Sequence, residues 1–182
     1  MTDTERKGTP LKRFVRRAVV TAALIAVPTM AGAPAFAAAT AGTPKKKPAV
    51  AVDQVAYETE VVKLTNAERS ARGCKTLRID DRLIASARAH STDMVKNRFF
   101  DHTGSDGSNF VTREVRAGYP KRDAAAENIA YGYKTPQQVV TAWMNSAGHR
   151  KNILNCASTA VGVGLVRTSS GTPYWTQNFG RG

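Results

Sequence analysis

The apolar residues of this chain follow a helical period along most of its length and a strand period near its C-terminal end. The last two apolar runs, "VGVGLVRT" and "YWTQNF", are rich in β-branched and aromatic residues and are joined by the turn-forming stretch "SSGTP". They predict an antiparallel hairpin. Before them, apolar residues recur at spacings of three and four. The change of period predicts an α+β fold, in which about four helices cover a small antiparallel sheet.

The first two helices are predicted in residues 53–73 and 79–98. Gly73 is the expected stop of the first, because glycine readily adopts the left-handed conformation that closes helices. Asp80 is the expected N-cap of the second. His90 lies on the apolar stripe of that helix, so we expect a packed, hydrogen-bonded side chain and not a ligand. The shared faces are Tyr57, Val61, Leu64 and Glu68 in the first helix and Leu83, Ala87, His90 and Met94 in the second.

Two further helices are marked by their end signals. A short third helix is predicted between a cap at Ser108 and a stop at Gly118. The fourth begins with Thr135 as cap and Pro136 at the first helical position, where proline loses no hydrogen bond. The predicted buried side of the fourth helix is Val139, Val140, Trp143 and Met144.

Residues 1–39 have the composition of an export signal. A basic flank precedes the apolar stretch "AVVTAALIAVPTMAGAPAFAAAT", which is broken by proline and glycine and ends in an A-x-A pattern, so cleavage is expected after Ala37 or Ala39. A retained membrane anchor is the alternative, because about 20 apolar residues span a bilayer. Residues 40–52, rich in proline and lysine, predict a tether. The chain is thus predicted to be secreted, with one domain in residues 53–182 and no stable membrane span after signal removal.

The strongly basic balance indicates the kind of surroundings that the chain favours. The formal net charge is +13, and about +9 remains after cleavage, since residues 1–39 contain six basic and two acidic residues. Such a charge favours anionic partners. Basic and aromatic residues do not interleave as a base-stacking surface requires, so no nucleic-acid partner is predicted. The expected partner is a cell-wall polymer or lipid, and the alternative for Lys45, Lys46 and Lys47 is that they only keep the tether soluble.

Two cysteines, Cys74 and Cys156, lie in a chain that is predicted to be exported. Disulfides persist outside the cell, so we expect a Cys74–Cys156 bridge that stabilises the fold by roughly 2 to 4 kcal/mol. Two free buried thiols are the alternative.

Three polar side chains lie where the periodic patterns lapse: His102 in "FFDHTGSDG", Glu127 in "AAENIAYG" and His149 just after Gly148, where the fourth helical run is expected to end. Two imidazoles and a carboxylate can form an open divalent-metal site or a proton-transfer set. In the structural alternative, Glu127 accepts backbone hydrogen bonds, His102 caps a turn and His149 binds carbonyls at the helix end.

Other chemistries have weaker support. Ser105, Ser108 or Ser146 could pair with a histidine and with Asp101 or Asp106, but the sequence has no G-x-S-x-G elbow. The cysteines are better used as a bridge than as nucleophiles. No phosphate-cradling glycine loop follows a predicted strand, so no nucleotide cofactor is predicted.

The order of the motifs resembles a known family. The stretches "LTNAERSARGCKTL", "AHSTDM", "FFDHTG", "AENIAYG", "WMNSAGHRKNIL", "VGVGL" and "YWTQNFG" are together similar to the CAP superfamily of cysteine-rich secretory, antigen 5 and pathogenesis-related proteins, in its bacterial SCP-like branch. The match covers nearly the whole domain. It implies an α-β-α sandwich with a large central cleft, and family members are linked to divalent-metal binding, to sterol or fatty-acid binding and to proteolysis.

The resemblance also implies a set of cleft residues. His102 and His149 correspond to the two histidines of the family's tetrad, and Glu127 to the glutamate of its G-E-N motif. The fourth member in eukaryotic relatives is a glutamate three residues after the helix tryptophan, a place held here by Ser146 with Asn145 beside it. This departure leaves three candidate ligands for a cation.

Three functional hypotheses follow from these residues. The preferred one is a secreted binding module whose cleft around His102, Glu127 and His149 accepts a small amphiphile or a cell-envelope ligand, with zinc, calcium or magnesium as an optional cation. The second is a metal-assisted, protease-like hydrolase, in which Glu127 acts as the base on a bound water. The third is a structural or interaction protein with a non-catalytic cleft.

Overall fold

The structure is a computed structural model that describes residues 49–182, with side chains from Gln54 onward. The predicted signal peptide and residues 40–48 of the predicted tether lie outside the described residues. The first helix begins at Ala49, a few residues before the predicted domain boundary. Among the described residues, no helix has both the length and the apolar character that crossing a membrane requires.

The described residues form helices and four strands. In chain order they are α1 (Ala49–Ser70), β1 (Arg78–Ile79), α2 (Asp81–Asn97), α3 (Phe110–Arg116), a 3-10 turn (Lys121–Asp123), β2 (Ala124–Tyr131), α4 (Pro136–Asn145), α5 (Ala147–Ile153), β3 (Ala160–Arg167) and β4 (Pro173–Gly180). The strands form one sheet in the order β1-β3-β4-β2. The predicted hairpin is confirmed as the antiparallel pair β3 and β4.

The α+β sandwich is confirmed, with two differences from the prediction. The described residues form five α-helices, because the chain bends at Ser146 after α4 and then continues as a separate short helix, α5. The sheet is mixed, because the two-residue strand β1 pairs in parallel with β3 while β2, β3 and β4 are antiparallel. A strand as short as β1 has no periodicity from which a sequence could reveal it.

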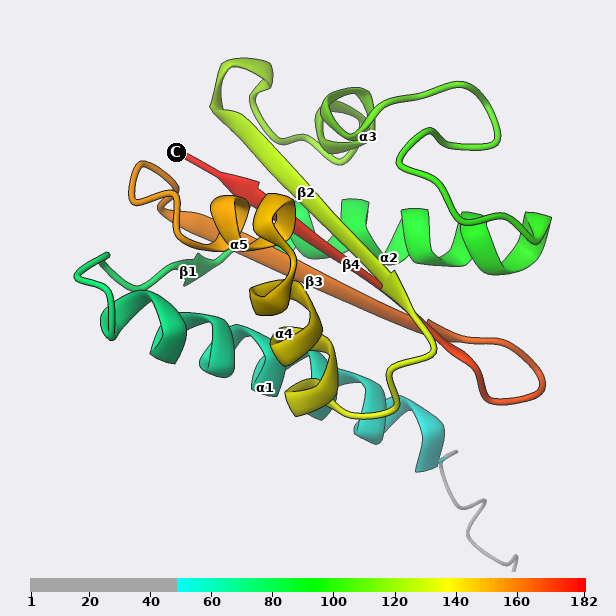
Figure 1. The fold of residues 1–182 in the computed structure, drawn as a ribbon. Helices are drawn as coiled ribbons and strands as arrows, with labels where there is room; N and C mark the ends of the chain where they lie inside the picture. The colour runs from blue at the N-terminus through cyan, green and yellow to red at the C-terminus, as the bar shows by residue number, and fades with distance from the viewer. Residues whose placement is uncertain (1–48) are drawn as a thin grey trace, which may run out of the picture. The chain divides into compact units, whose positions relative to one another are not determined.

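Helices cover both faces of the sheet (Figure 1). Helix α2 lies along one face against β3 and β4, and α1, α4 and α5 lie on the other, with α1 and α4 packed together. Helix α3 packs against α2 and the edge strand β2. The main core is on the α1 and α4 side, where Trp143, Trp175 and Phe179 are almost completely buried.

The predicted helix ends are mostly confirmed. Asp80 accepts a hydrogen bond from the Arg82 amide, and Thr135 accepts one from the Gln138 amide. The cap predicted at Ser108 is wrong, because the Asn109 side chain accepts from the Thr112 amide and α3 starts one residue later.

The buried face of α1 is more polar than its pattern predicts. Glu58, Thr65 and Arg69 are buried, whereas Glu68 is only partly covered. Glu58 accepts a hydrogen bond from the Leu165 amide and pairs with Arg88 of α2. The prediction differs because helical spacing selects apolar residues, and these buried charges are stabilised by partners far away in sequence.

The C-terminal end of α1 is fastened to the loop after α5. The predicted Cys74–Cys156 disulfide is confirmed. Beside it, the buried Arg69 guanidinium donates to the carbonyl oxygens of Lys75 at 3.0 Å and Ile153 at 2.7 Å. It also donates to the carbonyl oxygens of Asn155 and Ser158, both at 2.9 Å. We call these four contacts the Arg69 clamp. Burial lowers the pKa of Arg69, but guanidinium is basic enough to stay charged.

Helix α2 can approach β3 closely only because two residues of the strand are glycines. A β-carbon at Gly162 would lie 2.2 Å from the Ile84 nitrogen, and one at Gly164 would lie 2.3 Å from the Arg88 nitrogen. Both neighbours are helix backbone atoms, which cannot move aside individually. The glycines therefore set the distance between the sheet and α2, which carries His90 and faces α3.

The Gly164→Ala variant is expected to lose about 2–3 kcal/mol of stability, because the added methyl group would push α2 away from the sheet. Urea unfolding followed by circular dichroism measures this loss. Gly148→Ala is the matched control, since its added β-carbon would meet no described atom within 4 Å and alanine favours the helical conformation of α5. Equal unfolding midpoints for the two variants would contradict the close packing.

Candidate functional site

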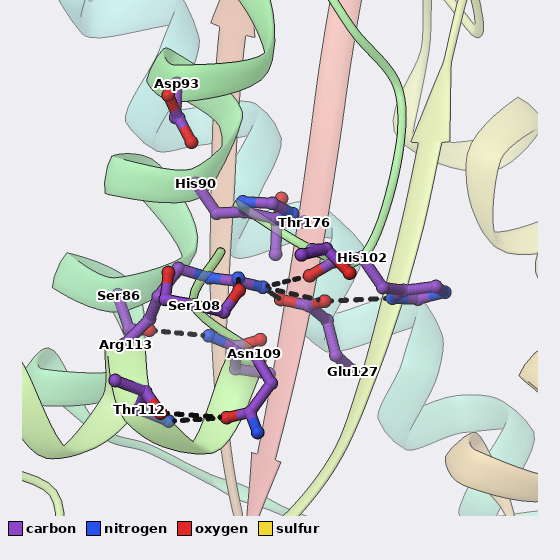
Figure 2. Close-up of polar contacts among 12 residues, drawn as sticks. Ser86, His90, Asp93, His102, Ser108, Asn109, Thr112, Arg113, Glu127 and Thr176 are labelled. Carbon is purple, nitrogen blue, oxygen red and sulfur yellow. Dashed lines mark hydrogen bonds and ion pairs between the residues drawn. The ribbon is translucent and has the colours of Figure 1, made fainter. Parts of the chain in front are cut away.

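Glu127 lies within β2, opposite Asn178 of β4, and not in an irregular segment as the sequence suggested. Its side chain is only 1% exposed. The Arg113 guanidinium of α3 donates to both carboxylate oxygens, at 2.8 and 3.0 Å, and the Nδ1 atom of His102 lies 2.9 Å from Oε1 (Figure 2). The carboxylate is thus satisfied by two side chains, which a buried charge requires.

Arg113 organises the loop that carries His102. Its Nη1 atom donates to the Ser108 carbonyl at 2.7 Å and its Nη2 atom donates to the His102 carbonyl at 2.9 Å. One buried guanidinium therefore joins α3, the 102–108 loop and β2. Arg113 was not predicted as a site residue, because an arginine in a short helix with other charged residues carries no signal of burial.

His102 keeps more than half of its side chain exposed, at 55%. The hydrogen bond to Glu127 raises the pKa of His102, and this effect outweighs the burial of the ring, which lowers it. With Nδ1–H donating to Glu127, the Nε2 atom remains available for a ligand. His102 is therefore a surface imidazole whose protonated form is favoured, and a buried carboxylate holds it in place.

His149 lies in the first turns of α5 and not in a turn after α4. Burial lowers the pKa of His149, and the nearby His102 lowers it further. The Asn128 side chain of β2 donates to the His149 carbonyl at 3.3 Å, and Asn152 of α5 donates to the Asn128 side chain at 2.9 Å. These amides fix α5 against β2, on the same strand that carries Glu127.

The two histidines are expected to titrate on opposite sides of the ordinary histidine pKa of 6.5, with His102 the last to lose its proton as pH rises. NMR titration of the imidazole signals measures both pKa values.

Glu127→Gln is expected to lower the pKa of His102, because the amide offers no negative charge to the ring. Since the His102 pKa is raised by folding, its contribution to stability is present below pH 6.5 and is lost as pH rises through the folded pKa. A higher pKa for His149 than for His102 would contradict this arrangement.

A cavity of about 470 Å³ opens between β2 and α4, next to these histidines. Its walls are largely aromatic, with polar groups only at Ser146, His149 and the tyrosine hydroxyls. The lining residues are Phe100, Ile129, Ala130, Tyr131, Tyr133, Ala142, Trp143, Ser146 and His149. We call it the aromatic cavity.

The aromatic side chains of this cavity are unusually exposed. Phe100, Tyr131 and Tyr133 are 43%, 53% and 40% exposed. Phe100 and Tyr131 contact each other with ring centres 4.8 Å apart, and Tyr174 stacks on Tyr131 at 5.6 Å. Trp143 is held in place in the cavity wall, because its indole N–H donates a hydrogen bond to the Ile129 carbonyl oxygen at 3.2 Å. Apolar rings held at the rim of a preformed hollow are typical of a binding site.

The structure therefore divides the residues that the sequence grouped. His102 and Glu127 contact each other, while His149 and Ser146 line the aromatic cavity. Asn145 lines an adjoining groove, which Ser146 also reaches. The aromatic rim was not predicted, although Tyr131 lies within the "AENIAYG" stretch and Tyr133 directly follows it.

The side chains present do not fit a divalent cation. Among residues 54–182, no three His, Cys, Asp or Glu side chains gather as a metal site requires. Both Glu127 oxygens already accept from Arg113, which would repel a cation.

Comparisons with known proteins agree with this fold. The model of the cysteine-rich secretory protein family, CAP, matches residues 62–179. The uncharacterized protein YkwD of Bacillus subtilis (strain 168) is 52% identical over 126 residues, which are 68% of this chain and 47% of that protein. This chain thus spans about half the length of that relative.

Two solved structures are similar as well. An extracellular protein containing a SCP domain from Bacillus anthracis str. Ames has a TM-score of 0.67 at 30% identity, covering 77% of this chain and 45% of that one. An outer surface protein from Borrelia burgdorferi has a TM-score of 0.61 at 23% identity, covering 68% of this chain and 90% of that one. The second likeness bears on the fold alone.

Proposed function

Because this chain belongs to the CAP family of cysteine-rich secretory proteins, we propose that its domain is an extracellular binding module for a small amphiphile of the cell envelope. The apolar part of the ligand lies in the aromatic cavity. Its polar part lies at the end marked by Ser146 and His149. No covalent chemistry is required of the site.

The aromatic cavity is the observation that carries this proposal. A volume of about 470 Å³ is within the range of small-molecule sites, which are largely apolar with a few polar groups that orient the ligand. Covering exposed aromatic rings with an apolar chain stabilises the complex by about 25 cal/mol per Å² of apolar surface that is buried. A polar end next to an apolar cavity matches the two halves of an amphiphile.

The charge and the sequence support a location at the cell envelope. The export signal predicted in residues 1–39 and the basic balance of the mature chain would place the domain next to anionic wall polymers or phospholipid head groups. Relatives include a protein described as extracellular, in Bacillus anthracis. The cavity then receives its ligand from that surface.

Binding of the fluorescent fatty acid cis-parinaric acid to residues 40–182 tests the proposal. We expect saturable binding with one site per chain, weakened about tenfold by Tyr131→Ala, since a tenfold loss corresponds to about 1.4 kcal/mol of apolar contact. Ile79→Ala is the matched control, because Ile79 is similarly exposed, at 48%, but lies on β1. Absence of saturable binding, or equal effects of the two changes, would refute the proposal.

Calorimetric titration with zinc, calcium and magnesium separates this proposal from a metal-assisted hydrolase. Such an enzyme needs at least three ligands on an open site. Binding of one ion per chain, lost in both His102→Ala and His149→Ala, would favour the hydrolase. Heat signals that are unchanged in these variants would leave the histidines as part of a binding site without metal.

A further inference from the structure

A second hollow continues the aromatic cavity along the outer side of α4. It has a volume of about 760 Å³. Its lining residues are Gly132, Tyr133, Gln137, Gln138, Thr141, Ala142, Asn145 and Ser146. We call it the α4 groove. Tyr133, Ala142 and Ser146 line both hollows, so the two adjoin at the polar end of the aromatic cavity.

The lining of the α4 groove is uncharged, and its polar side chains are set in a larger exposed apolar area. None of its lining residues, all within the described part of the chain, is acidic or basic, although the mature chain is strongly basic. Three side-chain amides and two aliphatic hydroxyls are present, at Gln137, Gln138, Asn145, Thr141 and Ser146. Amides and hydroxyls both donate and accept hydrogen bonds, which suits a partner that does the same.

The side chains that line this groove offer no positive charge to an anionic head group. Phosphate and carboxylate groups are recognised by guanidinium or ammonium groups, or by a helix N-terminus. The first turn of α4 begins at Pro136, which has no N–H to offer, and the side chain of Thr135 already accepts from Gln138. The groove therefore disfavours fatty acids and phospholipids at its own position.

An extended peptide is also a poor match. Peptides are commonly bound by pairing with the exposed edge of a sheet, which supplies backbone hydrogen bonds. The α4 groove is instead formed on a helix, whose interior backbone groups are bonded within the helix. Recognition must then come from side chains. Tyr133, which lines both hollows, is 40% exposed. Its aromatic ring is a surface on which the apolar face of a ligand ring can stack.

We propose that the α4 groove binds an uncharged carbohydrate head group, whose amphiphile places its apolar chain in the adjoining aromatic cavity. Sugar hydroxyls donate and accept as the groove amides do, and the C–H faces of a sugar ring can stack on Tyr133. This inference rests on the proposed function, because the apolar chain must occupy the aromatic cavity. It adds the class of ligand: a neutral glycolipid, distinguished from other amphiphiles by its head group.

Two amphiphiles with the same ten-carbon chain test the head-group preference. n-Decyl-β-D-maltoside and decanoate are titrated into residues 40–182 by calorimetry, each below its critical micelle concentration. We expect the maltoside to bind at least tenfold more tightly. The double change Gln137→Ala and Asn145→Ala is expected to remove that preference and to leave decanoate binding unchanged. Asn97→Ala, which removes an exposed amide at the end of α2, is the control and should change neither affinity.

The outcomes separate the two proposals. If decanoate binds as tightly as the maltoside, or if the double variant keeps the preference, the carbohydrate assignment is wrong while the aromatic cavity remains a site for amphiphiles. If neither compound binds, both proposals fail. Both proposals are supported if the maltoside binds more tightly than decanoate, if Tyr131→Ala weakens maltoside binding, and if the double variant abolishes the preference for the maltoside.

Discussion

The Arg69→Met variant is expected to be less stable than the wild-type domain by about 3–5 kcal/mol, which is a large part of the stability of a domain of this size. Methionine fills much of the same space but leaves the carbonyls of Lys75, Ile153, Asn155 and Ser158 without their donor. A buried polar group without a partner costs about 1–3 kcal/mol. The loss therefore comes from several groups at once.

Thermal and urea unfolding of the oxidised protein measure this effect. Arg72→Met is the matched control, because Arg72 lies in the turn just after α1 but is exposed and pairs, among the described residues, with Glu68 and the carbonyl of that residue. Exposed pairs of this kind contribute about 1 kcal/mol or less. A similar loss in both variants would show that the Arg69 clamp has no special weight.

The Glu114→Gln variant is expected to be more stable than the wild type at pH 7, by on the order of 3 kcal/mol, and equally stable near pH 4. Glu114 of α3 is fully buried, and neither of its carboxylate oxygens has a partner among the described residues. Burial, assisted by the charge of Glu127, raises the pKa of Glu114 from 4.5 to about 8. The residue therefore enters the folded domain as a neutral acid.

The sign of this effect follows from proton binding. Between pH 4.5 and about 8 the unfolded chain releases the Glu114 proton and the folded domain keeps it, so wild-type stability falls as pH rises through this window. Glutamine cannot ionise, which removes that dependence. Urea unfolding at several pH values from 4 to 9 measures both proteins, and Glu68→Gln, a change at the surface of α1, is the control. Parallel curves for the wild type and Glu114→Gln would mean that Glu114 is ionised in the folded domain.

The helices and strands with a periodic apolar pattern were predictable from the sequence, and a strand with buried polar residues was not. Helices α2 and α4 and the β3–β4 hairpin carry clear patterns with boundary residues such as Asp80 and Thr135. Strand β2 was missed, because "AAAENIAY" holds alanines with a buried glutamate and asparagine, and the partners that stabilise these polar residues, such as Arg113 of α3 and Asn152 of α5, are distant in sequence.

The candidate site was predictable residue by residue but not as an arrangement. His102, Glu127 and His149 were identified from irregular segments and from family likeness, yet the placement of His102 beside Glu127 depends on Arg113, which no pattern marks as buried. The aromatic cavity is formed where α4 crosses β2, so its rim joins residues such as Phe100 and Ser146 that are distant in sequence. Tertiary packing decides both features.

The Arg69 clamp has a consequence for the order in which the domain matures. Its acceptors Lys75 and Asn155 are the immediate chain neighbours of Cys74 and Cys156, so the same guanidinium positions the backbone on both sides of the disulfide. A chain that has folded but is still reduced would already hold its two thiols next to each other. Oxidation then adds a covalent bond to a connection that folding has made, and with two cysteines in the chain no incorrect intramolecular pairing competes with it.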